Sequence, residues 1–385
     1  MQILIAGDLV PTQSNIGLFS NGDITELLGE KLLFLWNEAD IRIFNLEVPI
    51  VDKENPIAKC GPNLITPTSS IEGIKALNPS LITLANNHIL DQGNRGFKST
   101  LNILNKNNIP YFGAGCNIYE ASKPYILYKD GFEIGVYACV EHEFSIATKN
   151  DPGANPFDPL ESLDHIQDLR NKCDHLIVLY HGGKEHYRYP SPDLQKVCRK
   201  IVDKGANLVV CQHSHCIGAF ENYNGSTIVY GQGNFLFDHS ESEFWQTSLL
   251  INVTLTAGNM SVEYIPIMKH GNSVRLADKQ NSKKILQDFG ERSRQILNEG
   301  FIQEAYNKFA AQMLNNYLLA FHGNNLFFRV LNKLCRHTLA SKLYTKKSMT
   351  VIENFVECEA HRELVLTGLK EKIGNQKLIS NTYWE

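Results

Sequence analysis

The chain contains no uninterrupted apolar run of about 18 residues, so no segment is long enough to cross a membrane as a helix. It has nine cysteines but no Cys-x-x-Cys pair, and several lie in apolar stretches such as YACV and VVCQ. There a free cysteine behaves as a small hydrophobic residue. Cys211 and Cys216 flank two histidines, but their spacing fits no zinc pattern. The odd number predicts a reducing compartment and no disulfide framework.

Charge is nearly balanced, with 37 lysines and arginines against 41 aspartates and glutamates in 385 residues. The lack of a basic excess argues against a nucleic-acid partner, which requires a positive surface for the phosphates. No GxxxxGK[ST] phosphate loop is present, which counts against an ATP-dependent ligase. The opening residues MQILIAGDLV lack the basic and long apolar segments of a signal peptide, so we expect a cytoplasmic protein.

Short apolar runs alternate with segments of helical spacing over most of the chain. Their richness in Val and Ile predicts strands, and the alternation is typical of an α/β fold whose sheet is buried on both faces. A hairpin is expected over 248–269, with its turn at 257–259. The expected strands are 2–8, 40–47, 80–87, 133–140, 175–183, 207–215 and 226–235, and the expected helices are 23–38, 95–107, 159–171 and 191–204.

The pattern changes after about residue 275, where helical spacing takes over. We therefore divide the chain into an α/β domain over 1–275 and a helical C-terminal extension over 276–385. Within the extension, residues 325–347 are amphipathic and locally basic. Such a segment could lie on an anionic membrane surface, contact a partner, or pack on the α/β domain with a solvated basic face. The sequence leaves these alternatives and the oligomeric state open.

Polar side chains follow almost every expected strand, at the point where the strand ends. In open α/β sheets the ligand crevice lies outside the carboxyl ends of the strands, which parallel strands bring to one edge. Asp, Glu, Asn and His offer the oxygen and nitrogen ligands that suit Zn, Mn, Fe or Mg. We therefore expect a metal site at this edge. The clusters are Gly7-Asp8, Asn45-Leu46-Glu47, Asn86-Asn87-His88, His181-Gly182-Gly183 with Glu185 and His186, Gln212-His213-Ser214-His215, and the residues from Gly231 to Phe235.

Each cluster taken alone has an ordinary structural explanation. Asp8 could cap a helix or turn, Glu47 could form a salt bridge, and Asn234 could stabilise a Gly-rich turn. His213 and His215 would face opposite sides of a continuing strand, so both reach one metal only if the strand has ended and turned. The same class of side chain at so many strand ends nevertheless favours a shared site.

Together these residues resemble the capsule-synthesis protein CapA (poly-γ-glutamate synthesis) family, which is similar to the calcineurin-like metallophosphoesterases. The resemblance covers about residues 1–270, and it implies a metallophosphoesterase-like layered sheet flanked by helices. The resemblance does not extend to the helical residues that follow. The motifs that carry the resemblance are GD (7–8), NLE (45–47), ANNHILDQG (85–93), HGGKE (181–185), HSH (213–215) and YGQGNFLFD (230–238).

The resemblance implies one or two divalent metal ions, Mn, Zn, Fe or Mg. Glu47 would take the place of the bridging carboxylate, and His88 would donate a proton to the leaving oxygen. The sequence departs from the family pattern at Val10, which stands where a histidine ligand is expected. Gln212 replaces a glycine, and His186 stands where relatives often have tyrosine. The implied metal ligands are Asp8, Glu47, Asn87, His181, His213 and His215.

Two further acidic residues are candidates for the chemistry. Asp91 could support His88, or with Gly93 could simply form the turn into the next helix. Glu185 could orient a histidine ligand or bind a substrate ammonium group. Two metal ions about 3.5–4 Å apart would clamp the attacking and leaving oxygens of a phosphoryl group.

Two functions follow from the resemblance. The first is a metal-dependent hydrolase or transferase that acts on a phosphoester or a related polymer intermediate in capsule, exopolysaccharide or poly-γ-glutamate metabolism. The alternative is a non-catalytic accessory or scaffold subunit among capsule-synthesis partners, which the missing histidine at position 10 favours.

Overall fold

The computed structural model describes residues 1–256, 258–321, 326–336 and 339–375. It divides into two compact units, Met1–Ile302 and Gln303–Glu385. The sequence alone assigned residues 276–302 to the helical extension. In the structure, α8 (Lys279–Gln295) contacts β15 and β11 and buries Phe289 among strand residues, so it belongs to the first unit.

The first sheet contains the strands expected at 2–8, 40–47 and 80–87. β1 to β4 run parallel, while β14, β15 and β16 extend the sheet antiparallel beyond β1. The predicted hairpin is confirmed by β14 and β15, although residue 257 of its turn lies outside the described residues. In spatial order the strands are β16 (Ser273–Leu276), β15 (Asn259–His270), β14 (Thr247–Thr256), β1 (Gln2–Val10), β2 (Ile41–Leu46), β3 (Leu81–Thr83) and β4 (Tyr111–Phe112), and β13 (Asn234–Phe237) also pairs with β1.

A second sheet faces the first, and the two sheets with their helices confirm the expected layered α/β fold. Its inner strands β12, β10, β9 and β7 are parallel, and its edge strands are antiparallel. In spatial order it consists of β11 (Phe220–Tyr223), β12 (Ser226–Val229), β10 (Leu208–Gln212), β9 (His175–His181), β7 (Phe132–Val140) and β6 (Tyr125–Lys129). A short ribbon pairs β5 (Ala114–Gly115) with β8 (Gly153–Ala154).

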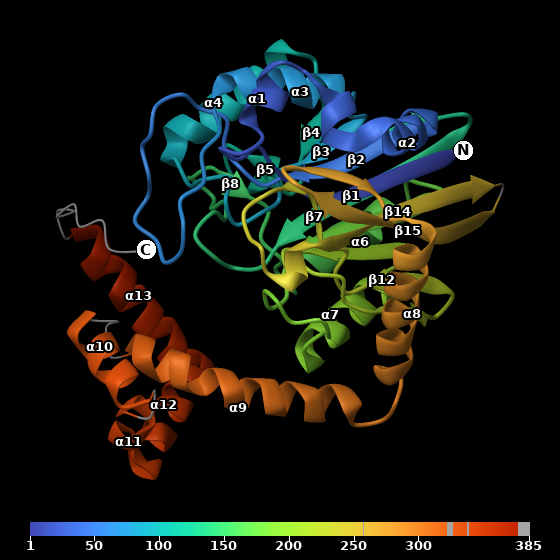
Figure 1. Ribbon diagram of the computed structural model, residues 1–385. Helices are drawn as coiled ribbons and strands as arrows, with labels where there is room; N and C mark the ends of the chain where they lie inside the picture. Colours follow the sequence, from blue (N-terminus) through green and yellow to red (C-terminus); the bar gives the residue numbers. More distant parts are fainter. Residues whose placement is uncertain (257, 322–325, 337–338, 376–385) are drawn as a thin grey trace. The chain divides into compact units, whose positions relative to one another are not determined.

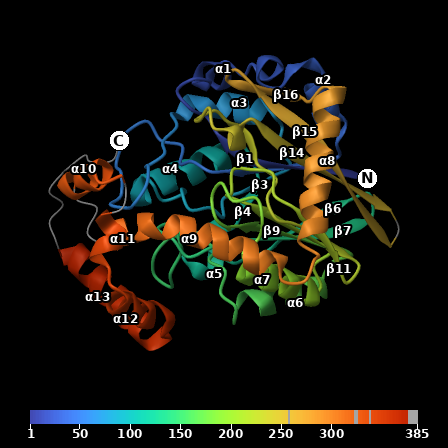
Figure 2. The ribbon, with the colours of Figure 1, turned by 60° about the horizontal axis from the view of Figure 1, so that its bottom comes forward.

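Side-chain alternation explains why two sheets form. Ile3 and Ile5 of β1 point into the layer between the sheets, whereas Leu4 and Ala6 point to the helices outside. Both faces of each inner strand are therefore buried, which is why the strands read as continuous apolar runs. The result is a layered arrangement of helices, sheet, sheet and helices (Figures 1 and 2).

Helices cover the outer face of each sheet. On the first sheet lie α1 (Ile16–Ser20), α2 (Ile24–Glu38), η1 (Thr68–Ser70), α3 (Ile71–Ala76) and α4 (Gly93–Lys106). On the second sheet lie α6 (Ser162–Arg170) and α7 (Pro192–Asp203). Shorter elements are α5 (Ile118–Ala121) and η2 (Glu243–Trp245).

The strand expected over 226–235 is interrupted, which corrects that prediction. The chain leaves the second sheet after Val229 and enters the first sheet at Asn234. Gly231 (φ 134°) and Gly233 (φ 77°) take backbone conformations that L residues rarely adopt. This crossing carries Asn234 to the carboxyl edge shared by both sheets.

Gly7→Ala will destabilise the protein, because a methyl group at position 7 overlaps the carbonyl oxygen of Gly233. Backbone cannot move aside as a flexible side chain can, so we expect a loss of at least about 2 kcal/mol in the free energy of unfolding. Urea unfolding measures this loss in the free energy of unfolding. The matched control is Gly17→Ala in α1, where an added Cβ meets nothing within 4 Å. Equal midpoints for the two variants would contradict this packing.

The second unit is entirely helical in its described part. Among the described residues, no helix is both long and apolar enough to span a membrane. Residues 325, 337 and 338 of the predicted amphipathic segment lie outside the description. The helices are α9 (Phe301–Phe321), which begins in the first unit, α10 (Leu326–Leu334), α11 (Leu339–Leu343), α12 (Lys346–Glu357) and α13 (Glu359–Asn375).

Candidate metal centre

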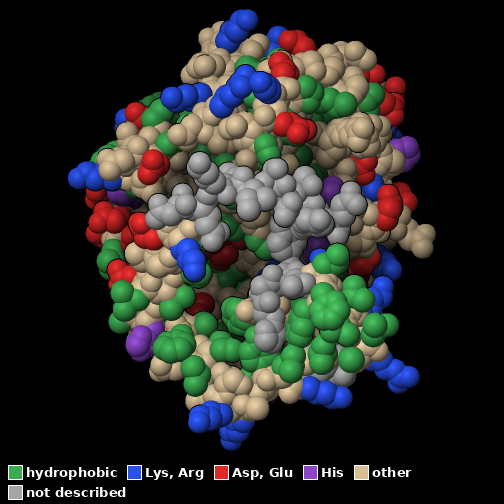
Figure 3. Space-filling model, turned by 90° about the vertical axis from the view of Figure 1, so that its left-hand side faces the viewer, with side chains coloured by type: hydrophobic (Ala, Val, Ile, Leu, Met, Phe, Trp, Pro, Cys, Tyr) green, Lys and Arg blue, Asp and Glu red, His purple; other side chains and the backbone are tan. Residues whose placement is uncertain are grey.

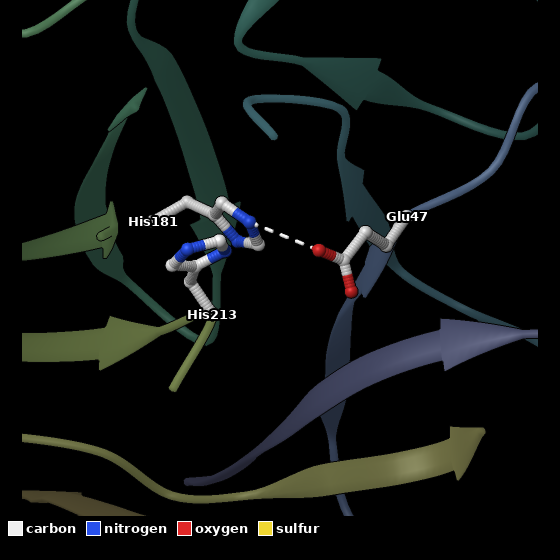
Figure 4. A group of neighbouring side chains, drawn as sticks. All are labelled: Glu47, His181 and His213. Atoms are coloured by element: carbon white, nitrogen blue, oxygen red, sulfur yellow. Dashed lines mark ion pairs between the residues drawn. The ribbon is translucent and has the colours of Figure 1, made fainter. Parts of the chain in front are cut away.

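Strand ends from both sheets meet at one buried cluster. Asp8 lies near the end of β1, and Glu47 directly follows β2. His181 is the last residue of β9 in the opposite sheet. Glu47, His181 and His213 point toward one another (Figure 4), and their ligand atoms lie within 4.8 Å of one another. The ligand atoms of Asp8, Glu47 and His215 are equally close. The two groups share Glu47.

Glu47 is the most unusual member because it is fully buried and neither carboxylate oxygen has a hydrogen-bond partner. His181 Nε2 lies 3.1 Å from Glu47 Oε1, but not in hydrogen-bond geometry. Burial raises the pKa of Glu47 from its ordinary range to about 8. A buried carboxylate without donors is stabilised by a nearby cation, so this position fits a metal ligand.

Asp8 is held in place by the backbone and by an amide. Its Oδ1 accepts a hydrogen bond from Asn45 Nδ2 (2.8 Å), and its Oδ2 accepts one from the His213 backbone N–H (3.2 Å). Burial, followed by repulsion from Glu47, raises the pKa of Asp8 to about 7. Two buried carboxylates thus lie close together, which a shared divalent cation would stabilise.

His213 and His215 can reach one site only if β10 has ended before them and the chain has turned, and both are the case. The strand ends at Gln212, and His213 (φ 85°) and His215 (φ 53°) both take the left-handed conformation. This conformation costs a residue with a Cβ about 1–2 kcal/mol, so the surrounding structure must stabilise it. The turn brings both imidazoles to the same cluster rather than to opposite faces of a strand.

The imidazoles are in the form that binds metal. Burial lowers the pKa of His181, lowers that of His213 well below its ordinary value, and lowers that of His215 to about 3. The three rings are therefore neutral near pH 7, and a neutral ring nitrogen can donate its lone pair. His213 Nδ1 is buried and has no hydrogen-bond partner.

The donor set fits a divalent metal. Two carboxylates and three neutral imidazoles provide oxygen and nitrogen ligands, and several of their buried polar atoms have no other partner. Both groups contain Glu47, and its role as a bridging carboxylate stays a prediction. The donor types do not distinguish Mn, Zn, Fe and Mg.

Asn87 lies beside the cluster with its amide already oriented. Its Nδ2 donates to Glu143 Oε2 (2.9 Å), which turns Oδ1 toward His181 Nε2 (3.0 Å). The oxygen is thus available on the side of the histidines. That Asn87 is a metal ligand stays a prediction.

His88 is part of a buried network that contains a residue the sequence reasoning missed. His88 Nδ1 lies 2.6 Å from Asp91 Oδ2, and Lys59 Nζ lies 2.5 Å from Asp91 Oδ1 and 3.2 Å from His88 Nδ1. Asp91 also accepts from the Leu64 N–H (2.6 Å). The structure shows both expected roles: Asp91 contacts His88, and Asp91 and Gly93 also form the turn that leads into α4. Lys59 lies in a loop without a motif, so no sequence signal pointed to it.

Asn45 and Asn86 were also missed as functional residues. Asn86 Nδ2 donates to Asn45 Oδ1 (2.9 Å) and to the Leu46 carbonyl (2.8 Å), and Asn45 in turn donates to Asp8. These amides tie together the ends of β1, β2 and β3. Both stand within the predicted polar clusters, but only their pairing across strands reveals their role.

Asn234 and Trp245 support His215 from the crossing segment and η2. Asn234 Oδ1 lies 2.8 Å from His215 Nδ1, and the ring centroid of Trp245 lies 4.6 Å from that of His215. Trp245 Nε1 donates to His186 Nε2 (2.9 Å). Asn234 therefore contacts the site rather than only stabilising a Gly-rich turn.

Other candidates lie at the edge of the cluster or outside it. Glu185 Oε1 is 3.9 Å from His213 Nε2, too far for a hydrogen bond, and its side chain is 43% exposed. The Sγ atoms of Cys211 and Cys198 are 3.6 Å apart. No cysteine belongs to either described ligand group. Val10 is buried and offers no ligand.

Comparison with known proteins gives the family. The model of the family described as "Bacterial capsule synthesis protein PGA_cap" matches residues 2–239. The chain belongs to this family. The match spans every strand end of the cluster and stops before β14.

Curated relatives agree with the assignment. The PGA biosynthesis protein CapA of Bacillus subtilis is 30% identical over 256 residues, which cover 64% of this chain and 67% of that protein. The capsule biosynthesis protein CapA of Bacillus anthracis is 27% identical and covered over 56% of its length. A Mycobacterium tuberculosis "Probable polyglutamine synthesis accessory protein" is 26% identical and covered over 69%. A Mycoplasma pneumoniae phosphatase structure, 14% identical, matches 70% of this chain and 93% of its own with a TM-score of 0.43, too low to support a conclusion.

Lys59→Met will destabilise the protein without removing bound metal. The side chains of Lys59 and Asp91 are 2% and 0% exposed, so the substitution leaves a buried carboxylate without its cation. We expect a loss of about 3 kcal/mol in urea unfolding and unchanged metal content by mass spectrometry. In the control, Lys75→Met breaks an exposed pair with Glu72 and should cost less than about 1 kcal/mol. Similar losses in the free energy of unfolding for both variants would show that the buried Lys59–Asp91 pair stabilises the protein no more than an exposed pair.

Proposed function

We propose that this chain is a metal-dependent hydrolase or transferase acting on a phosphoester or a related intermediate of capsular polymer metabolism. The observation that carries the proposal is Glu47, whose buried, unpartnered carboxylate is shared by two groups of candidate ligands. Family membership and the names of the Bacillus relatives support poly-glutamate capsule as the polymer.

Asp8, Glu47, His181, His213 and His215 would hold the metal, with Asn87 beside them. A divalent cation bound there would act as a Lewis acid toward a phosphoryl oxygen. The chain's own contribution is to orient these ligands through Asn45, Asn86 and Asn234. The ligands are all buried, which shields them from bulk water.

His88 would donate a proton to the leaving oxygen of the substrate. The Asp91 carboxylate, fixed by Lys59 and the Leu64 N–H, contacts His88 Nδ1 and holds the ring in place. A proton on His88 Nε2 would then pass to the departing oxygen. His88 is 9% exposed, so it is reachable while Asp91 is not.

The test uses purified protein stripped of metal and reloaded with Mn²⁺, with bis(p-nitrophenyl) phosphate as the substrate. We expect hydrolysis that requires both the metal and His88, and that survives His165→Asn on α6. Bound metal without any His88-dependent activity on a panel of phosphodiesters and phosphomonoesters would contradict the proposal.

An accessory or scaffold role is the second candidate, and Val10 favours it because one expected ligand is absent. A relative's name, a polyglutamine synthesis accessory protein, points the same way. Elemental analysis separates the two. Negligible metal, together with normal polymer production in cells carrying Asp8→Ala and His213→Ala, would establish the scaffold.

A further inference from the structure

The helical unit exposes apolar side chains that a packed domain would bury. Most of the exposed large hydrophobic residues in the described part of the chain belong to α9–α13. Figure 3 shows hydrophobic side chains gathered on one face of the molecule. Contiguous exposed apolar surface of this kind marks an interaction site. The clearest examples are Leu326, Val330 and Leu334 on α10, and Leu364, Val365, Leu366, Leu369 and Ile373 on α13.

α10 has the geometry of an amphipathic helix. Leu326, Val330 and Leu334 are 64%, 50% and 75% exposed, and their four-residue spacing places them in one stripe along the helix. Arg329 and Lys333 are spaced to flank this stripe, and both are exposed.

Charge identifies the kind of surface that this face fits. Residues 326–347 contain six basic residues and no acidic one: Arg329, Lys333, Arg336, Lys342, Lys346 and Lys347. In a two-fold dimer the same patch meets itself, so the six cations of each copy would face six of the other. An anionic lipid surface accepts both features, because headgroup phosphates attract the cations while the acyl boundary accepts the apolar stripe.

We propose that α10 and the basic residues after it bind the surface of an anionic lipid bilayer. Leu326, Val330 and Leu334 enter the boundary between headgroups and acyl chains. Arg329 and Lys333 extend their aliphatic stems beside the stripe and place their charges among the headgroup phosphates. The helix lies in the plane of the membrane and does not span it, in agreement with its nine residues. This binding does not depend on the metal centre.

Vesicle flotation of the full chain tests the proposal. We expect binding to vesicles containing about 30 mol % phosphatidylglycerol, little binding to pure phosphatidylcholine, and release at about 0.5 M NaCl. Leu326→Gln/Val330→Gln/Leu334→Gln should weaken the partition coefficient at least about ten-fold, and Arg329→Gln/Lys333→Gln should weaken it while reducing its salt dependence.

The controls carry the same chemical changes on the first unit. Tyr128→Gln/Leu160→Gln removes apolar side chains that are 71% and 80% exposed, and Lys129→Gln/Lys172→Gln removes two exposed lysines. Both should bind vesicles like the unaltered chain, and circular dichroism confirms that the α10 variants are folded. Equal binding to neutral vesicles, no binding to either type, or a dimer in solution that the triple α10 variant dissolves would each overturn the proposal.

Discussion

Glu47→Gln should abolish metal binding and at the same time make the metal-free protein more stable at alkaline pH. The glutamine keeps the shape of the side chain but removes a charge that lies fully buried without a hydrogen-bond donor. A cation site that loses its shared carboxylate should lose at least about 100-fold in affinity. In the metal-free protein the same change removes the penalty of burying that charge.

The pH dependence of this effect on stability follows from the direction in which the pKa of Glu47 is shifted. Glu47 has its pKa raised to about 8 in the folded protein, above its value in the unfolded chain. Its favourable contribution is therefore complete below the unfolded pKa and is lost as the pH rises through the folded pKa. Relative to the unaltered protein, the variant should gain about 2–5 kcal/mol at about pH 9 and much less at about pH 6.

Urea unfolding at the two pH values, with and without Mn²⁺, measures both effects. Glu221→Gln is the matched control, because Glu221 is also buried but is paired with Arg199 and accepts from Tyr230 Oη (2.8 Å). That substitution breaks satisfied interactions and should destabilise the protein at both pH values. A Glu47 variant that behaves like the Glu221 variant would show that Glu47 has partners of its own.

His88→Asn should reduce kcat by about 10²–10⁴ while leaving the bound metal in place. His88 is outside both ligand groups, and its Nδ1 faces Asp91, so its loss removes a proton donor and not a ligand. Turnover of a phosphodiester measures the rate, and elemental analysis measures the metal.

Asn87→Ala provides the contrast for His88. It removes the amide oxygen that faces His181, so metal affinity should fall about ten-fold or more, and added metal should restore part of the rate. Loss of metal from the His88 variant, or rescue of its rate by metal, would assign His88 to the ligand set instead.

The residues of the centre could be named from the sequence because each follows an apolar run. Val and Ile at successive positions predict a buried strand, and a polar cluster directly after it must lie at the strand's end. Asp8, Glu47 and His181 were found in this way. Lys59 could not be found, because it lies in a loop whose course is set by contacts of Asp91 with Lys59 and Leu64.

Backbone conformation at the centre also depends on contacts distant in the sequence. Nothing local predicts that His213 and His215 take positive φ, since this conformation is unfavourable for a residue with a Cβ. It persists because the His213 N–H bonds to Asp8 and the His215 ring contacts Asn234 and Trp245. The break at Gly231 and Gly233 is likewise set by the close approach of Gly233 to Gly7.

By itself, the sequence determined the alternation of strands and helices, the polar strand ends, and the apolar stripe of α10 with its flanking basic residues, because each of these is a local pattern of neighbouring residues. The tertiary structure decided that the strands form two facing sheets, so that Glu47 from one meets His181 and His213 from the other. It also decided which amides orient which ligands. The physical reason is that these contacts join residues at least 19 positions apart in the sequence, and only the packing of the sheets brings them together.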